Sequence, residues 1–537
     1  MKKTLTCAFS VLLAVSLYAG PAPRIQVPQT SRRDSISANI QNYICRIMAD
    51  WKIPGMAVAI EQNDSILFCK GFGVKELHGA GDTGFVDEHT LFQIGSVSKS
   101  FTAALVAQLV DEGKISWEDT VKNILPDFEM YDPWVTANMQ VKDIMTHRFG
   151  LKEQIGTYIP NLGYDRDDIY EMLRLIPPAY SFRGDFQYSN IAFEIAARII
   201  ERETGESWEK NVHERIFDRL GMHDSKVGGR EFAATEDLAT PHDWGFRGDS
   251  IYVVPEYGPE QALWWLTQIE PAGGVCCSVT DLLKWAEFHL HGGKAPAVAC
   301  PDSLCPTDSV SVISGKQMKY LHKGQTIASQ GDDRILLYAQ GWYVEQTSEG
   351  RVYYHTGTTW GFTTLCFFMP QLDLAGAVLV DSETSSKPRF SIMRRTIDLF
   401  SDRPDEDYSG KWLAEWYSDN RIADTTASVT NAAAAGRSDS TLVIPAAELD
   451  TITGNYANTP LFGNASVTVE NGTPYITIGK QGWKHPMKYV KQDSYTFRSD
   501  GHEFGIEFKT VPTNGKAYSF SIDWGYGEPF PDWVRSK

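Results

Sequence analysis

The chain is poor in positive charge and lacks long apolar runs beyond its first twenty residues. Lysine and arginine number 50 against 68 acidic residues, so the formal net charge is −18. That balance argues against nucleic acid or an anionic membrane surface as the main partner. No later stretch reaches about 18 unbroken apolar residues, the length that a membrane-spanning helix needs. We therefore expect no membrane span and no nucleic-acid partner.

Several motifs of cofactor and metal enzymes are also missing. The sequence has no G-x-x-x-x-G-K-[ST], no H-E-x-x-H and no G-x-S-x-G. These absences argue against nucleotide cofactors, a metalloprotease-type zinc site and the nucleophile elbow of α/β-hydrolases. No C-x-x-C pair and no paired Cys/His spacing occurs either. We therefore expect neither a metal nor a cofactor.

Cysteine is scarce, with eight in 537 residues. Cys300 and Cys305 flank a short polar loop, "CPDSLC", and could form a disulfide in an oxidising compartment. The cysteines after the first twenty residues are Cys45, Cys69, Cys276, Cys277, Cys300, Cys305 and Cys366. Their odd number leaves at least one free thiol, and we expect most of them to be small core residues.

The N-terminal residues have the pattern of a secretory signal peptide. Lys2 and Lys3 form a basic start, an apolar run extends from Cys7 to Leu17, and small residues follow. The apolar run is too short for a membrane span. We expect residues 1–20 to be a signal peptide cleaved near Ala19, and the mature protein to be secreted or periplasmic.

The hydrophobic pattern predicts an α+β domain over residues 30–400. Apolar residues recur with helical spacing over 36–51, and two apolar runs then flank Asn63-Asp64 as in a hairpin. Helical and loop patterns fill residues 100–290, and two strands return around Gln371–Asp373 before a helix near 388–400. An antiparallel sheet built from both ends, flanked by helices and carrying an inserted helical cluster, satisfies the preference for packed layers.

The remaining residues predict a linker and a small all-β domain. Residues 401–445 are small, polar and poor in apolar anchors, which suits a linker. Residues 446–537 alternate apolar and polar side chains, with tight-turn pairs at Asn471-Gly472, Asp500-Gly501 and Asn514-Gly515. We expect a small β-barrel or sandwich there. Its aromatic residues stand at alternating positions, which favours a core role over a binding role.

The stretch "QIGSVSKSFTAA" places Lys99 one helical turn after Ser96. On a helix these side chains share a face, with Cβ atoms about 5–6 Å apart. The backbone N–H groups and the dipole at a helix N-terminus stabilise negative charge. An oxyanion that develops when a serine there reacts is therefore stabilised. Burial can lower a lysine pKa from about 10.4 to roughly 7–8, which makes the amine a base. Burying Lys99 lowers the stability of the fold, but it allows the amine to act as a base.

Other motifs follow in a fixed order. Tyr188 and Asn190 form a Tyr-x-Asn pair before an apolar helical pattern, and His355-Thr356-Gly357 precedes a strand pattern. Chance copies of the first two motifs occur at Ser207/Lys210 and Tyr456/Asn458, so neither motif is specific alone. The order and setting of the three motifs are what make them informative.

These motifs resemble those of serine β-lactamases and penicillin-binding proteins: Ser-x-x-Lys, Tyr-x-Asn and Lys/His-Thr-Gly. The segments "IMTHRFGL" and "IFDRLGMHDS" are similar to further stretches of the family, and the resemblance covers roughly residues 35–400. The class C β-lactamase-like branch, which includes D-alanyl-D-alanine carboxypeptidases, D-aminopeptidases and esterases, is the most similar. Hydrolases of this kind often carry an appended β domain of unknown role.

The resemblance implies a catalytic role for three side chains. Ser96 would be the nucleophile that forms an acyl-enzyme, and Lys99 would hold and deprotonate it. Tyr188 would pass the proton to the leaving group, as a phenolate or as a hydrogen-bonded phenol. The backbone N–H groups of Ser96 and Thr358 would form the oxyanion hole, where one donor contributes about 3–4 kcal/mol.

The same resemblance implies substrate-binding roles for other residues. Asn190 would orient Lys99 and the substrate amide, His355 and Thr356 would face the substrate's carboxylate end, and Gly357 would let substrate approach the strand edge. Structural alternatives remain, because Tyr188 and Asn190 could belong to a helix start capped by Ser189, and His355 could be an ordinary strand-end histidine.

Two positions depart from the family pattern. His355 stands where most β-lactamases carry lysine, and a neutral imidazole is a weaker anchor for a carboxylate. Arg148 and Phe149 replace Thr-Ser in the His-Thr-Ser-Gly-Leu stretch, in which we take His147 to be structural. The His-Thr-Gly form resembles the carboxypeptidase and D-aminopeptidase members more than efficient β-lactamases.

We therefore expect a secreted serine hydrolase that cleaves D-amino-acid peptides, amides or esters, with weak β-lactamase activity as a variant of this function. The alternative is a non-catalytic sensor that binds penicillins or peptidoglycan fragments. The sequence leaves open the substrate, the oligomeric state and the role of the β domain, because loops such as 295–333 decide substrate choice.

Overall fold

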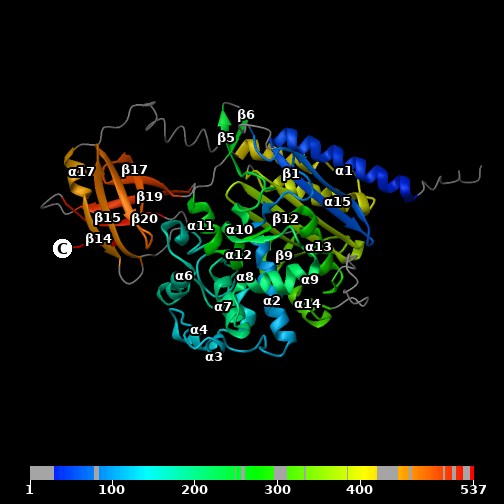
Figure 1. Cartoon of the computed structure of the whole chain (residues 1–537), viewed down its shortest axis with the longest axis horizontal. Coiled ribbons are helices and arrows are strands. Elements are labelled where there is room, and N and C mark those ends of the chain that lie inside the picture. Colours follow the sequence, from blue (N-terminus) through cyan, green and yellow to red (C-terminus); the bar gives the residue numbers. More distant parts are fainter. Residues whose placement is uncertain are drawn as a thin grey trace, which may run out of the picture.

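The computed structural model describes residues 29–537 except 78–83, 248–249, 256–259, 296–310, 332–333, 384, 405, 420–445, 459–461, 500–501, 511–515, 524–531 and 537. The expected signal peptide, the Cys300/Cys305 pair, most of the expected linker and the turns at Asp500-Gly501 and Asn514-Gly515 lie outside the described residues. Within the described chain, every helix falls short of the length and apolarity that crossing a membrane requires. Two bodies are visible, a mixed helix-and-sheet part and a barrel at one end (Figure 1).

An eight-stranded antiparallel sheet organises the larger part. Its strand order is β2-β1-β13-β12-β11-β10-β9-β8, so the first hairpin pairs with a strand more than 300 residues later. The strands are β1 (Gly55–Gln62), β2 (Ile66–Gly73), β8 (Thr326–Gln330), β9 (Ile335–Tyr338), β10 (Tyr343–Gln346), β11 (Arg351–Thr359), β12 (Phe362–Met369) and β13 (Leu374–Val380). This confirms the expected antiparallel sheet built from both ends of the domain.

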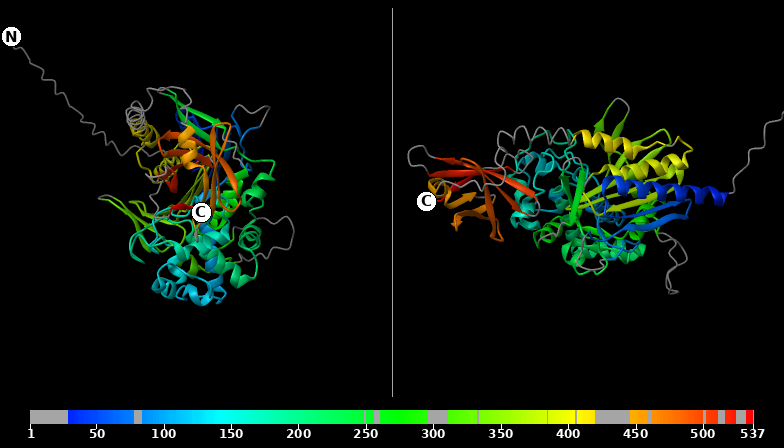
Figure 2. Two further views of the ribbon diagram at one scale, coloured as in Figure 1. Left: turned by 90° about the vertical axis from the view of Figure 1, so that its left-hand side faces the viewer. Right: turned by 90° about the horizontal axis from the view of Figure 1, so that it is seen from above.

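Helices cover both faces of this sheet because alternate strand residues are apolar on each face. On one face, Met56, Val58 and Ile60 of β1 pack with the helices α1 (Gln29–Trp51) and α15 (Lys387–Phe400). On the other face, Ala57 and Ala59 join the core beneath α13 (Val279–Leu290). Figure 2 shows α1 and α15 lying side by side over one face.

A helical cluster is inserted between β2 and β8. The central helix α2 (Ser98–Asp111) is buried along nearly its whole length and packs against α7 (Ala192–Thr204) and α12 (Glu270–Gly273). The other helices are α3 (Val121–Ile124), α4 (Pro133–Asn138), α5 (Val141–Ile144), α6 (Arg166–Met172), α8 (Trp208–Val212), α9 (Asp218–Leu220), α10 (Gly228–Ala233), α11 (Glu260–Gln268) and α14 (Gly315–Leu321). Short strands β3 (Phe92–Gln93), β4 (Lys226–Val227) and β7 (Val275–Cys277) form a small sheet, and β5 (His242–Arg247) pairs with β6 (Ser250–Pro255).

The C-terminal part is a closed eight-stranded barrel. It comprises α17 (Ala446–Ile452), β14 (Gly454–Asn458), β15 (Gly463–Glu470), β16 (Thr473–Ile478), β17 (Trp483–Lys491), β18 (Ser494–Ser499), β19 (His502–Thr510), β20 (Ala517–Asp523) and β21 (Trp533–Arg535). The expected hairpin at Asn471-Gly472 is present, with both residues in the left-handed region. The structure thus confirms a barrel, and the aromatic residues Tyr456, Phe508 and Phe520 pack against one another inside it.

The barrel is docked on the helical cluster beside α6 and α11 (Figures 1 and 2). The Tyr164 hydroxyl donates to the Phe462 carbonyl, and Lys480 Nζ lies 3.0 Å from Asp165 Oδ2 and 3.2 Å from Asp168 Oδ2. The buried apolar cluster of the larger part also continues without interruption into the barrel.

The beginning of the expected linker is instead part of the packed structure. Residues 408–419 are helical, and Trp416 lies against Trp51, with ring centroids 5.5 Å apart. Trp51 Nε1 also donates to Ser409 Oγ at 3.0 Å. Two tryptophans and a leucine in an otherwise polar stretch supply the anchors that the composition argument overlooked. The exact limits of the expected domains stay predictions.

Candidate active site

Ser96 and Lys99 lie at the start of the buried central helix. Ser96 is in a single 3₁₀ turn, Gly95–Val97, that runs directly into α2, and Lys99 is in the first turn of α2. The Lys99 side chain is fully buried, and its Nζ lies 3.0 Å from Ser96 Oγ. The two side chains therefore meet as the spacing predicted.

Two fixed acceptors decide how the Lys99 amine is oriented. Nζ lies 2.6 Å from Asn190 Oδ1 and 2.9 Å from the carbonyl oxygen of Ala272. Burial lowers the pKa of Lys99 well below its ordinary value. A neutral amine has two N–H bonds and one lone pair. The two acceptors take the N–H bonds, which leaves the lone pair directed at the Ser96 hydroxyl.

Asn190 is itself held in one orientation. Its Nδ2 donates to Gln154 Oε1 at 3.1 Å and to Thr157 Oγ1 at 2.9 Å, so its Oδ1 must face Lys99. Asn190 immediately precedes Ile191, the N-cap residue of α7, and no side chain caps this helix. The alternative in which Ser189 caps the helix is therefore wrong.

Tyr188 lies above Lys99 and reaches the nucleophile. Lys99 Nζ is 4.8 Å from the Tyr188 ring centroid, and the Tyr188 hydroxyl interacts with the Ser96 hydroxyl. Burial raises the pKa of Tyr188 well above its ordinary value, and the interaction with Ser96 opposes this only in part. The phenol is therefore protonated, and of the two expected forms the hydrogen-bonded phenol is favoured over the phenolate.

His147 fixes the loop that carries Tyr188. Its Nδ1 accepts a hydrogen bond from the Ser189 N–H at 3.1 Å, and its ring lies 4.3 Å from the Tyr188 ring. Burial lowers the pKa of His147 well below its ordinary value, and Lys99 lowers it further when that amine is protonated, so His147 remains neutral. The sequence interpretation of His147 as a structural residue agrees with these contacts.

The edge of β11 is pressed against the turn that carries Ser96. β10 pairs with β11 only as far as Tyr354, and the free edge beyond it faces the 3₁₀ turn. A Cβ added to Gly357 would lie 1.8 Å from the Ile94 carbonyl, and one added to Gly95 would lie 2.7 Å from Thr358 N. Both glycines are needed because the two backbones touch. This approach brings the N–H groups of Ser96 and Thr358 into one region.

His355 and Thr356 are separated by the pleat of β11. Thr356 lines the cleft, whereas His355 is fully buried beneath the strand. His355 Nε2 lies 2.9 Å from the Tyr338 hydroxyl, and burial, together with repulsion from Lys99 when that amine is protonated, lowers the His355 pKa to about 3. The structure therefore places His355 away from the cleft surface and without a positive charge.

The catalytic groups open into a cleft of about 400 Å³. Ser96, Tyr188, Asn190, Thr356 and Thr358 line it directly. Its other walls are aromatic or acidic and comprise Glu153, Tyr158, Phe186, Trp265, Tyr343, Trp360 and Glu383, among others. Of the residues predicted for the site, only Lys99, His355 and Gly357 lie behind the lining.

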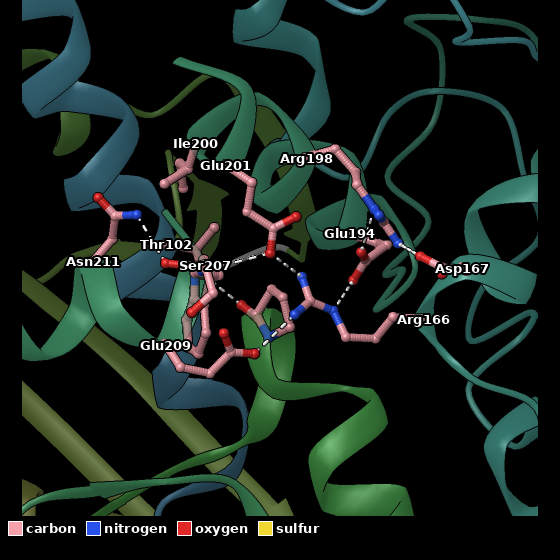
Figure 3. Close-up of polar contacts among 12 residues, drawn as sticks. Thr102, Arg166, Asp167, Glu194, Arg198, Ile200, Glu201, Ser207, Glu209 and Asn211 are labelled. Atoms are coloured by element: carbon pink, nitrogen blue, oxygen red, sulfur yellow. Dashed lines mark hydrogen bonds and ion pairs between the residues drawn. The ribbon is translucent and has the colours of Figure 1, made fainter. Parts of the chain in front are cut away.

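Sequence reasoning missed an ion network directly behind the site. Figure 3 shows Arg166 surrounded by three carboxylates, Glu194, Glu201 and Glu209, at 2.9–3.0 Å. Arg166 stands at the start of α6, and the three acids come from α7 and α8. These residues look like ordinary surface charges in the sequence, and no motif marks them.

This network extends to the peptide that holds Lys99. Burial and the adjacent Glu209 raise the pKa of Glu270 well above its ordinary value, so Glu270 is protonated and donates to Glu209. Burial opposes ionisation of Glu209, yet the Glu270 hydrogen bond and Arg166 lower its pKa to about 2. Glu270 begins α12, which also contains Ala272, the carbonyl acceptor of Lys99. The ion network thus anchors the catalytic amine from behind.

The described lining residues of the cleft contain no cluster of three potential metal ligands. Among the described residues, Glu61, Asp64 and His291 bring ligand atoms within 4.8 Å of one another, at the β1–β2 hairpin and the end of α13. None of the three lines the cleft. The described lining residues offer no comparable group for a metal ion.

The chance copies of the motifs have ordinary structural roles. Ser207 is the N-cap of α8 and accepts from the Lys210 N–H, while the Lys210 ammonium pairs with Glu206 at the surface. Tyr456 is buried in the barrel and donates to the Ile452 carbonyl. Neither copy lines the cleft.

The fold and the Ser-Lys-Tyr arrangement together define the class of serine β-lactamase and penicillin-binding-protein hydrolases. The Beta-lactamase family profile matches residues 40–398, well over half of the chain. The chain belongs to the beta-lactamase family.

One characterised relative is the unguisins hydrolase ungD' of Aspergillus campestris (strain IBT 28561), which is 27% identical over 373 residues. That match covers 66% of this chain and 63% of the relative, so the chain spans less than two thirds of the relative's length.

Two solved structures share the fold. The octameric penicillin-binding protein homologue from Pyrococcus abyssi has a TM-score of 0.56 at 19% identity, covering 91% of this chain and 98% of that chain. The D-amino acid amidase from Ochrobactrum anthropi SV3, complexed with D-phenylalanine, has a TM-score of 0.53 at 19% identity, covering 68% of this chain and 98% of that chain. At these identities the likeness supports the fold alone.

Proposed function

We propose that the protein is a serine hydrolase that cleaves amide or ester bonds of small substrates derived from D-amino acids, through an acyl-enzyme on Ser96. The observation that carries the proposal is the setting of the Lys99 amine, which is buried, held by two carbonyl-type acceptors and aimed at Ser96 Oγ. A structural lysine gains nothing from this arrangement, whereas a general base requires it.

The geometry supports a two-step reaction. Neutral Lys99 takes the Ser96 proton as Oγ bonds to the substrate carbonyl carbon, and the N–H groups of Ser96 and Thr358 stabilise the oxyanion. The bond to the leaving group then breaks, and the Tyr188 phenol donates its proton to the leaving atom while receiving one from the Lys99 ammonium. Water hydrolyses the resulting ester by the reverse proton path, which regenerates the Ser96 hydroxyl and neutral Lys99.

The printed name of one structural neighbour, a D-amino acid amidase, is the reason for proposing D-amino-acid substrates. The relative named an unguisins hydrolase supports the proposal of hydrolysis, without the D-amino-acid preference. The open cleft, with aromatic walls beside the nucleophile, suits a small amide or a peptide end.

Intact-protein mass spectrometry with a fluorescent penicillin tests the nucleophile. We expect a covalent adduct on the wild type and on the Ser207→Ala control, and none on Ser96→Ala. Slow loss of the adduct indicates turnover, whereas a permanent adduct indicates the sensor alternative. If no adduct forms, p-nitrophenyl esters and D-alanyl peptides replace the penicillin, and hydrolysis that Ser96→Ala retains in full contradicts the proposal.

A further inference from the structure

The fixed charges of the cleft are negative. Glu153 and Glu383 are the only residues with a formal charge among the described lining residues, and both are exposed. Glu153 directly precedes Gln154, whose side chain holds Asn190, and its charge acts on the hydroxyls of Tyr188 and Tyr343. A carboxylate therefore stands within electrostatic reach of the catalytic tyrosine.

Two cations near the cleft, Lys99 and Arg389, are buried behind its surface, and Arg389 interacts electrostatically with Glu383. Lys99 is buried and shares its hydrogens with Asn190 and Ala272. Arg389 is buried, and its Nη1 donates to the Gly357 carbonyl on β11. His355, the position expected to meet a substrate carboxylate, is buried and neutral. No described lysine, arginine or histidine lines the cleft.

The aromatic residues of the cleft also favour a positively charged group on the substrate. Tyr158, Phe186, Trp265, Tyr343 and Trp360 all line the cleft. The faces of aromatic rings carry partial negative charge and attract ammonium groups. Carboxylates and aromatic faces together are the usual surroundings of a bound ammonium, and they disfavour a bound carboxylate.

We propose that this cleft selects substrates with a free ammonium group, such as amides, peptides or esters with an unblocked amino end, and that Glu153 is the main specificity residue for that group. This inference rests on the proposed Ser96 hydrolase and narrows its substrate class. It separates the protein from carboxypeptidase-type members of the family, whose substrates end in a carboxylate near the scissile bond. Glu383 adds to the negative field from the segment that follows β13.

Matched p-nitroanilides of D-phenylalanine with a free, an acetylated or a succinylated amino group test the selection directly. These substrates share one leaving group and differ in charge, which is positive, neutral and negative. We expect kcat/KM to fall in that order, by about tenfold for loss of the ammonium, as for a partly exposed ion pair supported by aromatic contacts. The preference should weaken in 0.5 M NaCl because exposed charges are screened.

Two variants test whether Glu153 causes the preference for the free-amine substrate. Glu153→Gln should remove most of the advantage of the free-amine substrate over the acetylated one, through a rise in KM for the free amine. Glu171→Gln, an exposed glutamate on α6 that pairs with Arg174, is the matched control and should keep the wild-type preference.

The outcomes separate the two proposals. Equal kcat/KM for the free and acetylated substrates, or an unchanged preference in Glu153→Gln, overturns the ammonium selection and leaves the Ser96 hydrolase intact. Ampicillin and benzylpenicillin, which differ by an ammonium group, repeat the comparison as rates of Ser96 acylation. Absence of any Ser96-dependent reaction with all of these probes contradicts the hydrolase itself.

Discussion

Catalysis at this site depends on three basic side chains that remain uncharged. Lys99, His147 and His355 are all buried together, and burial lowers the pKa of each. Each would repel the others if protonated, so the set is stable only as neutral groups. The low pKa of Lys99 is thus supported by its neighbours as well as by the absence of water.

Lys99→Arg separates hydrogen bonding from basicity. A guanidinium can donate hydrogen bonds to the same acceptors, but it cannot act as a base because it stays protonated. We expect the rate of adduct formation to fall by about 10²–10⁴-fold, the usual contribution of general-base catalysis. The measurement is intact-mass kinetics with the fluorescent penicillin or the best substrate.

The control for this variant is Lys210→Arg in the second Ser-x-x-Lys stretch, which should react at the wild-type rate. Near-normal acylation by Lys99→Arg would contradict a role for Lys99 as the base.

His322→Gln tests the cost of a half-buried neutral histidine. Burial lowers the His322 pKa to about 3, from an ordinary value of 6.5. Between these values the unfolded chain binds the proton and the folded chain does not, so stability falls as the pH drops. From pH 7 to pH 5 this one residue should remove about 2 kcal/mol from the wild-type free energy of unfolding.

Urea unfolding at pH 7 and pH 5 measures this effect. The difference between wild type and His322→Gln should shift by that amount between the two pH values. The opposite, smaller shift is expected for His89→Gln, because the Asp224 hydrogen bond raises the His89 pKa and the residue is largely exposed. A difference that does not change with pH would contradict the assignment.

At the scale of elements, the site is assembled by helices that carry no motif. The ion network of Arg166 ties α6 to α7 and α8, and through Glu270 to α12. α7 follows Asn190, and α12 supplies the Ala272 carbonyl, so both acceptors of the Lys99 amine depend on this junction. The packing of these helices therefore determines the orientation of the Lys99 amine.

Arg166→Met should destabilise the protein strongly. It removes a cation that contacts three carboxylates at once, and breaking a largely buried charge network from one side costs about 3–5 kcal/mol. We expect a loss of this size in the free energy of unfolding, measured with denaturant, together with slower acylation.

Arg174→Met is the matched control, because Arg174 forms an exposed pair with Glu171 that is worth less than about 1 kcal/mol. If both variants proved equally stable, the network would have no structural role.

At the scale of the whole molecule, the barrel lies close enough to influence the cleft. Tyr158, a lining residue, contacts Phe504 of the barrel, with ring centroids 6.5 Å apart, and Trp360 across the cleft at 6.2 Å. The barrel is therefore placed to support one aromatic wall of the site.

Gly479→Ala tests that support. A Cβ at Gly479 would lie 1.4 Å from the Leu162 carbonyl, so the barrel could not dock as it does. We expect a severalfold rise in KM for cleft substrates and faster proteolysis between the two parts. Gly472→Ala has the same positive φ of 81° but nothing within 4 Å, so it carries the strain of about 1 kcal/mol without the clash. Identical behaviour of the two variants would show that barrel docking does not affect the cleft.

The sequence by itself determined the local features of this protein. The period-2 strands, the turns at Asn63-Asp64 and Asn471-Gly472, and the Ser96/Lys99 spacing follow from short-range geometry, and the structure shows each of them. The strand patterns at both ends of residues 30–400 also predicted the antiparallel sheet, and the alternation of apolar and polar residues predicted the barrel-like C-terminal part. Such features need only neighbouring residues to be specified.

The tertiary structure decided what depends on long-range contacts. It turned His355 away from the cleft, packed residues 408–419 onto α1, and joined Arg166 to acids on two other helices. It also left carboxylates as the charged residues of the cleft lining. Burial and partner identity set the charge of each group, and both arise only when distant segments meet.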